Sequence, residues 1–248
     1  MKIINMRLYI YIFVSLALVC CSTSKEIQDS LKQYKSPLGY LHKGNDSVCN
    51  KPVYLKSISF VGLDSISKVT HMYGFAIPLL VYNYFETNKK VVLGQNSMDK
   101  NYSQFFKESL IERSKRSGLI QIINEDTIRF NDYNLEILID TCITKARYKE
   151  KTTIMVSSTF ISYSMYAGSF PSETYISIKL KIRNGNNIVL EKKYKVSKIQ
   201  NYPFQFDNIG FDESNSPLIT NMVESLSLST KDIIDEMVID IINSVKDN

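Results

Sequence analysis

The sequence has few of the residues on which catalytic and metal sites commonly depend. Its 248 residues include no tryptophan, two histidines, four cysteines and nine glycines. Neither His42 nor His71 has a second histidine, a cysteine or a spaced carboxylate cluster nearby, which argues against a zinc site. The scattered glycines form no phosphate-binding loop, and no Gly-x-Ser-x-Gly motif marks a nucleophile. We therefore predict a protein that is not an enzyme and has no metal and no cofactor.

The sequence also lacks a strong excess of charge of one sign. The formal net charge is +5, from 30 basic and 25 acidic residues. Loss of residues 1–20 would remove Lys2 and Arg7 and lower that net charge to +3. Such a balance is far from the basic face of a nucleic-acid-binding protein, so we predict no nucleic-acid partner. We interpret the short basic clusters Lys89-Lys90, Arg113/Lys115/Arg116 and Lys192-Lys193 as solvated faces. The alternative is a basic sheet edge that faces anionic lipid head groups, where each charge would add only about 1 kcal/mol.

The N-terminus has the composition of a secretion signal. An apolar run from Leu8 to Val19, broken only by Ser15, follows Lys2 and Arg7. The run is shorter than the roughly 20 residues that a bilayer-spanning helix needs, and so it is typical of a signal-peptide core. It ends in Cys20 and Cys21 where an ordinary signal has small residues. This ending resembles the lipobox of bacterial lipoproteins, in which a cysteine is acylated and becomes the first mature residue.

The acylated cysteine is predicted to be Cys21, with Cys20 as the alternative. Leu18 and Val19 precede Cys20, and a small residue usually stands directly before the modified cysteine. Choosing Cys21 puts the small Cys20 in that position, whereas choosing Cys20 puts the bulky Val19 there. An ordinary signal peptide or an uncleaved anchor with incidental cysteines is the other interpretation.

We divide the chain into three parts. Residues 1–20 are the signal peptide, residues 21–51 a lipidated tether, and residues 52–248 a single α+β domain that contains an aromatic-rich insertion at 62–98. The remaining cysteines, Cys49 and Cys142, form a possible disulfide, which an extracytoplasmic compartment permits. A buried thiol at Cys142 is equally consistent with its strand-like surroundings.

The most unusual segment of the domain is aromatic and apolar. It spans residues 75–85, is interrupted by the polar residues 86–90, and resumes at 91–93. We predict a hairpin of two strands with a turn at 86–90. The alternative is an aromatic flap that contacts lipid or a partner protein through Phe75, Leu79, Leu80, Tyr82, Tyr84 and Phe85.

The other elements follow from hydrophobic periodicity. We expect strands at 53–61, 119–123, 135–144 and 176–182, the last joined to 188–196 by a turn at Asn184–Asn187. Residues 153–165 are either a further strand or a partly exposed segment. A helix near 102–113, capped by Asp99 or Asn101, precedes Gly118. Residues 199–228 are expected to be loop-like, and a final helix is expected to begin at Ser229 or Thr230.

The order of these elements has a family likeness. With the lipobox in front, the segments "FFKESLIERSKRSGLIQI", "SETYISIKLKIRNGNNIVLEKKYKV" and "TKDIIDEMVIDIINSV" resemble outer-membrane lipoproteins of the YajG, LptE and transport-auxiliary kinds. The resemblance covers about 60 residues and does not include the insertion. It implies an antiparallel or mixed sheet with two helices packed on one face, anchored in the outer membrane on its periplasmic side or at the cell surface.

The functional expectation is a non-enzymatic accessory, assembly or binding subunit of the cell envelope. It would contact the membrane through its lipid and an envelope protein through the aromatic segment. One alternative is a carrier or sensor of an apolar small molecule, with a cavity lined by Ile139, Phe160 and Ile178. A second alternative is a periplasmic hydrolase, which would need carboxylates clustered around either histidine.

Overall fold

The structure is a computed structural model that describes eleven elements of secondary structure. The described residues are 51–62, 68–73, 81–97, 100–117, 120–123, 132–156, 161–169, 171–200, 205–207 and 211–246. The strands are β1 (Lys51–Phe60), β2 (Lys68–Tyr73), β3 (Val81–Leu93), β4 (Ile120–Ile123), β5 (Tyr133–Val156), β6 (Ile161–Ser169), β7 (Ser172–Asn184), β8 (Asn187–Gln200) and β9 (Gln205–Asp207). The helices are α3 (Tyr102–Ser117) and α4 (Phe211–Lys246).

All nine strands belong to one mixed sheet. The main path is β2-β3-β5-β1-β4, while β6 and β7 pair with β5, β8 pairs with β7, and β9 pairs with β6. Strand β1 runs parallel to β4 and β5, and every other pairing among these strands is antiparallel. The chain therefore has the expected α+β fold.

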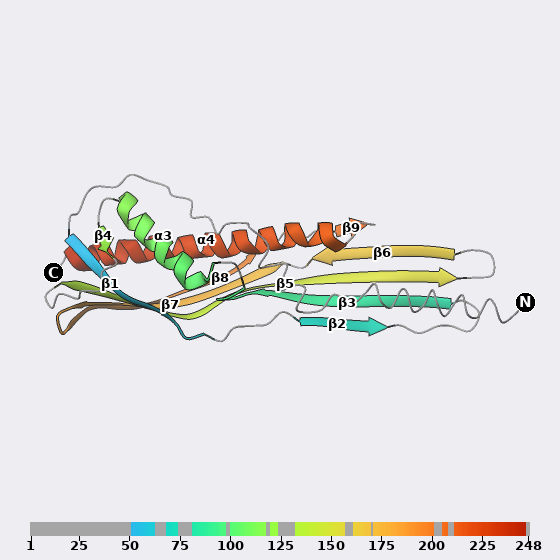
Figure 1. Cartoon of the computed structure of the whole chain (residues 1–248), viewed down its shortest axis with the longest axis horizontal. Helices are drawn as coiled ribbons and strands as arrows, with labels where there is room; N and C mark the ends of the chain where they lie inside the picture. Colours follow the sequence, from blue (N-terminus) through green and yellow to red (C-terminus); the bar gives the residue numbers. More distant parts are fainter. Residues whose placement is uncertain are drawn as a thin grey trace, which may run out of the picture.

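Strand β5 joins two parts of this sheet. Its 24 residues would span roughly 75 Å if fully extended. Its first half pairs with β1 and β7, and its second half pairs with β3 and β6. We call the first part, with β1, β4, β7, β8 and both helices, the body. We call the second part, with β2, β3, β6, β9 and β5 from Thr144 onward, the extension. Figure 1 shows β3, β5 and β6 running on past the N-terminal end of α4.

Both helices cover one face of the body, which we call the inner face, as predicted. Alternate residues of β5 and β7 point toward the helices, among them Leu135, Ile137, Ile178 and Leu180, all at most 1% exposed. A β-bulge between Ile139 and Thr141 shifts this alternation by one residue. The shift keeps the next residues of β5, Cys142 and Thr144, on the inner face. Helices α3 and α4 bury their own apolar stripes against these rows.

Hydroxyl groups also join the helices to the sheet. The Thr230 hydroxyl donates to the Leu226 carbonyl at 2.8 Å and lies 2.9 Å from the Tyr102 hydroxyl, which must donate to it because Thr230 has one proton. Burial raises the pKa of Tyr102 well above its usual value. A second chain of buried hydroxyls, Thr144, Thr174 and Ser225, links β5, β7 and α4 at 3.0 and 2.8 Å.

Two local predictions are confirmed. The Asn101 side chain caps α3 by accepting a hydrogen bond from the Gln104 backbone N–H at 2.8 Å. The β7–β8 hairpin turns at Gly185 and Asn186, and Gly185 has a φ of 58°, a conformation that favours glycine.

The predicted start of the last helix was wrong. Helix α4 begins at Phe211, so it includes much of the segment that was expected to be loop-like. Among its described side chains, the buried stripe includes Leu218 and Ile219, continues through Met222 and Leu226, and passes Thr230 without interruption. Thr230 bonds back to the preceding turn and does not cap a helix. Over the described residues, neither helix combines enough length with enough apolar character to cross a membrane.

The predicted turn at residues 86–90 was also wrong. Those residues lie in the middle of β3, paired with β2 on one side and β5 on the other. The β2–β3 pair brings Tyr73 opposite Phe85, so the connection between the two strands is at 74–80, which lies outside the described residues. The polar residues fit a strand because Glu86 pairs with Lys149 at 3.0 Å, and Thr87 is buried on the other face.

Candidate functional site

The face of the sheet that points away from the helices, which we call the outer face, carries charged residues at both ends and uncharged ones between them. Successive residues of a strand alternate between faces, so β5 places Lys145, Arg147, Lys149 and Lys151 together on the outer face. Strand β7 places Lys179, Lys181 and Arg183 on this face in the same way. These charges can bind a ligand only where the protein does not already neutralise them.

Ion pairs engage most of the charged side chains on the outer face of the body. Asp140 lies 2.7 Å from Lys193 and 3.5 Å from Lys179, and Glu136 lies 2.5 Å from Lys56. The hydrogen bond from Lys193 lowers the pKa of Asp140, and the bond from Lys56 lowers that of Glu136. The carboxylates are therefore ionised and balanced by lysines at neutral pH.

Three hollows follow one another from the body into the extension. The first, of about 480 Å³, is lined by Thr141, Ile143, Lys145, Tyr175, Ile176, Ser177, Lys195, Val196 and Ser197. The second, of about 460 Å³, shares Lys145 with the first and also includes Glu173 and Ile199. The third, of about 440 Å³, shares Lys90 and Arg147 with the second. Together they make an open groove along the outer face, which we take as the candidate functional site.

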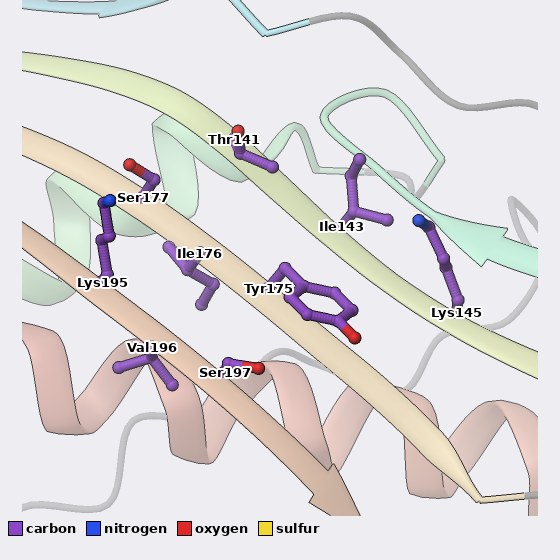
Figure 2. A pocket seen from close by; sticks show the side chains of 9 residues that line it. All are labelled: Thr141, Ile143, Lys145, Tyr175, Ile176, Ser177, Lys195, Val196 and Ser197. Atoms are coloured by element: carbon purple, nitrogen blue, oxygen red, sulfur yellow. The ribbon is translucent and has the colours of Figure 1, made fainter.

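Tyr175 forms the centre of the first hollow. In Figure 2 its ring lies on the middle strand, with Ile143 and Lys145 on one side and Ser197 on the other. The Lys145 ammonium lies 5.6 Å from the ring centroid, and the Tyr175 hydroxyl donates to Glu173 at 3.1 Å. That hydrogen bond raises the pKa of Tyr175. The hollow therefore offers an aromatic surface and cations for recognition, and these groups suit binding.

The third hollow contains a row of cations. Lys68 of β2 is paired in register with Lys90 of β3, which is paired with Arg147 of β5. All three are exposed, and no ion pair to them is found among the described residues. This row was missed at the level of sequence. The alternation of basic residues from Lys145 to Lys151 was visible, but only the strand register brings Lys68 and Lys90 beside it.

The solvated-face interpretation of the other basic clusters was wrong in part. Lys89 is 3% exposed and lies on the inner face, 5.7 Å from the Tyr148 ring centroid. Arg113 is 8% exposed and pairs with Asp235 at 2.7 Å. Lys192 is also paired, reaching Glu236 and Asp240 of α4 at 2.9 and 2.7 Å.

Most of the predicted site residues cannot be placed. Cys20, Cys21, Cys49, Phe75, Leu79 and Leu80 lie outside the described residues. Tyr82, Tyr84 and Phe85 belong to the first half of β3. Cys142 is fully buried in the core beside Tyr102. The predicted disulfide, acylation and partner contacts therefore remain predictions.

The residues named for the two alternative functions are not brought together at one site in the described part of the chain. There, no group of three or more His, Cys, Asp or Glu residues is placed to hold a metal ion. Ile139 and Ile178 are fully buried in the core, and neither lines the hollows of the groove. Phe160 and His42 lie outside the described residues.

Comparison with known proteins gives one distant structural similarity. No family model matches the sequence, and no curated protein matches it. Among solved structures, the fold is similar to one described as "Crystal structure of protein XCC0632 from Xanthomonas campestris, family-model DUF330". The identity is 12%, the TM-score is 0.38, and the alignment covers 81% of this chain and 90% of that one.

Proposed function

We propose that this chain is a lipid-anchored, non-enzymatic lipoprotein of the outer membrane that acts as an accessory, assembly or binding subunit. The anchor is Cys21, and the periplasmic side or the cell surface is the site of action. This is the role that the resemblance to YajG, LptE and transport-auxiliary lipoproteins implies. A partner protein of the envelope contacts the aromatic segment at residues 75–85.

The shape of the sheet supports a contact at this segment. Val81 at the start of β3 pairs with Val156 at the end of β5, which pairs with Ile161 at the start of β6. The beginning of β3 therefore lies at the far end of the extension, beyond the N-terminal end of α4 (Figure 1). From Thr144 to Val156 the paired strands would reach roughly 40 Å, enough to hold a contact well away from the core.

The partner contact is tested by site-specific photocrosslinking in cells. A crosslinking amino acid at Tyr82 is compared with one at Ile188, an exposed residue at the β7–β8 turn. We expect Tyr82 to capture one envelope protein that Ile188 does not capture, and the captured protein to co-purify with the unmodified chain. Equal capture from both positions would contradict the proposal. Deleting 75–93 is unsuitable as a test, because β3 lies between β2 and β5 and its loss would break the sheet.

The anchor is tested by intact-mass analysis of protein extracted from membranes. Wild-type protein should carry lipid and begin at Cys21, and Cys21→Ser should abolish that modification. Cys20→Ser, which keeps a small residue before the acceptor, is the matched control and should be acylated normally. Absence of lipid from all three proteins would refute the anchor.

A carrier of an apolar small molecule is a second candidate, favoured by the hollow at Tyr175. Its volume of about 480 Å³ falls in the range of small-molecule sites. Tyr175 and Ile143 supply its aromatic and apolar surface. A fluorescent apolar probe should bind the wild type and lose affinity in Tyr175→Ala. Unchanged affinity would argue against this candidate.

A further inference from the structure

The row Lys68–Lys90–Arg147 places three like charges on directly paired residues. Neighbouring residues across an antiparallel pair have Cβ atoms about 5 Å apart, and like charges in such pairs destabilise a sheet. Exposed lysines often relieve such repulsion by pairing with a carboxylate. Within the described part of the chain, none of these three has such a pair.

Two carboxylates beside the row have partners of their own. Glu173, which lines the adjoining hollow with Lys90 and Arg147, accepts a hydrogen bond from the Tyr175 hydroxyl at 3.1 Å. Glu86 of β3 accepts a hydrogen bond from the Asn88 side-chain amide at 3.0 Å and pairs with Lys149 at 3.0 Å. The Thr70 hydroxyl, which also lines this hollow, donates to the Asn88 carbonyl at 3.2 Å. The groups around the row are therefore satisfied by one another, while the row itself keeps its donors and its charge.

The row borders a hollow of a size that admits a small anion. The third hollow of the groove has a volume of about 440 Å³ and is lined by Lys68, Lys90, Arg147 and Lys149. We propose that this hollow is a binding site for a phosphate group, held by Lys68, Lys90 and Arg147. A phosphate carries up to two negative charges and several acceptor oxygens, which matches two ammonium groups and one guanidinium fork. Lys149 adds long-range attraction while it stays paired with Glu86.

The surroundings of the row bear on where the phosphate comes from. Ile199 is 66% exposed and lines the adjoining hollow together with Lys90 and Arg147. An exposed apolar side chain beside a cationic row suits a phosphate that is attached to an apolar group. A lipid head group and a free phosphate share the same recognition by the row, and only the lipid would also use Ile199. The site does not depend on the lipid anchor or on the aromatic segment.

The test measures binding to the full-length chain in a neutral detergent by isothermal titration calorimetry. The probes are inorganic phosphate, short-chain phosphatidylglycerol and short-chain phosphatidylcholine, each below its micelle concentration. The variant Lys68→Gln/Lys90→Gln/Arg147→Gln removes the row. We expect the wild type to bind the two anionic probes, with roughly fivefold loss for each cation removed and so about 100-fold loss in the triple variant. Raising the salt concentration should weaken binding further.

The matched control is Lys100→Gln/Lys107→Gln/Lys115→Gln, which removes the same charge from α3 and from the residue two positions before it, on the other side of the sheet. It should bind within about twofold of the wild type. Equal losses in both triple variants, or no binding of either anionic probe, would overturn the proposal. Tighter binding of a single-stranded oligonucleotide than of both anionic probes would overturn it as well.

Two further readouts complete the test. Phosphatidylglycerol binding at least tenfold tighter than inorganic phosphate, with that advantage lost in Ile199→Ser, identifies a lipid source. Equal affinity identifies a free phosphate. The single variant Lys90→Thr guards against misfolding, because it removes the central cation while placing a strand-favouring residue in β3. It should lose roughly fivefold in phosphate affinity with an unchanged far-UV circular dichroism spectrum.

Discussion

The body and the extension of this protein share one strand and are stabilised differently. In the body, the first half of β5 packs Leu135, Ile137 and Ile139 under two helices, and its outer charges are ion-paired. In the extension, the second half of β5 carries Arg147 next to Lys90 with no such pairing among the described residues. The difference indicates that the extension keeps charge available for binding.

The largest change in stability is expected from a core substitution in the body. Ile178→Ala removes a fully buried side chain beneath α4 and should lower the free energy of unfolding by about 2–5 kcal/mol. Met72→Ala, at a 54% exposed residue of the extension, should change it by less than about 0.5 kcal/mol. Urea unfolding followed by circular dichroism measures both. A loss at Met72 as large as that at Ile178 would show that the extension contributes to the core.

A smaller effect is expected at the junction between the two parts. Thr174→Val keeps the shape of a fully buried side chain but removes the middle hydroxyl of the chain that joins Thr144 to Ser225. The two remaining hydroxyls each lose a partner in the core, so we expect a loss of about 1–3 kcal/mol in urea unfolding. Ser197→Ala, at an exposed position on β8, is the control and should be nearly neutral. A neutral Thr174→Val would mean that other groups satisfy these hydroxyls.

The sequence predicts the body far better than the extension, and the reason is physical. A half-buried strand such as 176–182 alternates apolar and polar residues, so both its existence and its inner face can be read directly. The segment from Lys145 to Lys151 has few apolar residues, because it is held by its neighbours in the sheet. Its basic residues alternate visibly, but the strands that lie beside it are known only from the register of the sheet.

The same limit applies to the candidate site. Lys68, Lys90 and Arg147 are far apart in sequence, and only the register of two strand pairs brings them into one row. The start of helix α4 was predicted too late for a related reason. Its hydroxyl-bearing residues Ser225, Ser229 and Thr230 are types that favour the caps of helices. Here they are buried, and Ser225 and Thr230 bond to groups on β7 and α3.

Acid should slightly lower the stability of the fold by protonating the carboxylates on the outer face of the body. The pKa values of Asp140 and Glu136 are lowered by their lysine partners, so each carboxylate stabilises the fold above its unfolded pKa of about 4. That contribution is lost as the pH falls from about 4 through the folded pKa. Asp140→Asn should lower stability by less than about 1 kcal/mol at pH 7 and have no effect near pH 2. Urea unfolding at both pH values measures this, and an equal loss at pH 2 would exclude the ion pair as its cause.

The smallest expected effect on stability is a gain, and it tests most directly how the charges of the body and the extension differ. Lys90→Thr removes the central cation of the row, relieves repulsion from Lys68 and Arg147, and should raise the free energy of unfolding by a few tenths of a kcal/mol. Added salt screens the same repulsion, so the gain should shrink between 0.02 and about 0.5 M salt. Lys181→Thr is the control, because Lys181 is paired with Glu191 at 3.2 Å and its loss relieves no such repulsion. Urea unfolding across the salt series separates the two variants. A gain at Lys90 that does not depend on salt would reflect β-propensity alone and would remove the electrostatic contrast between the body and the extension.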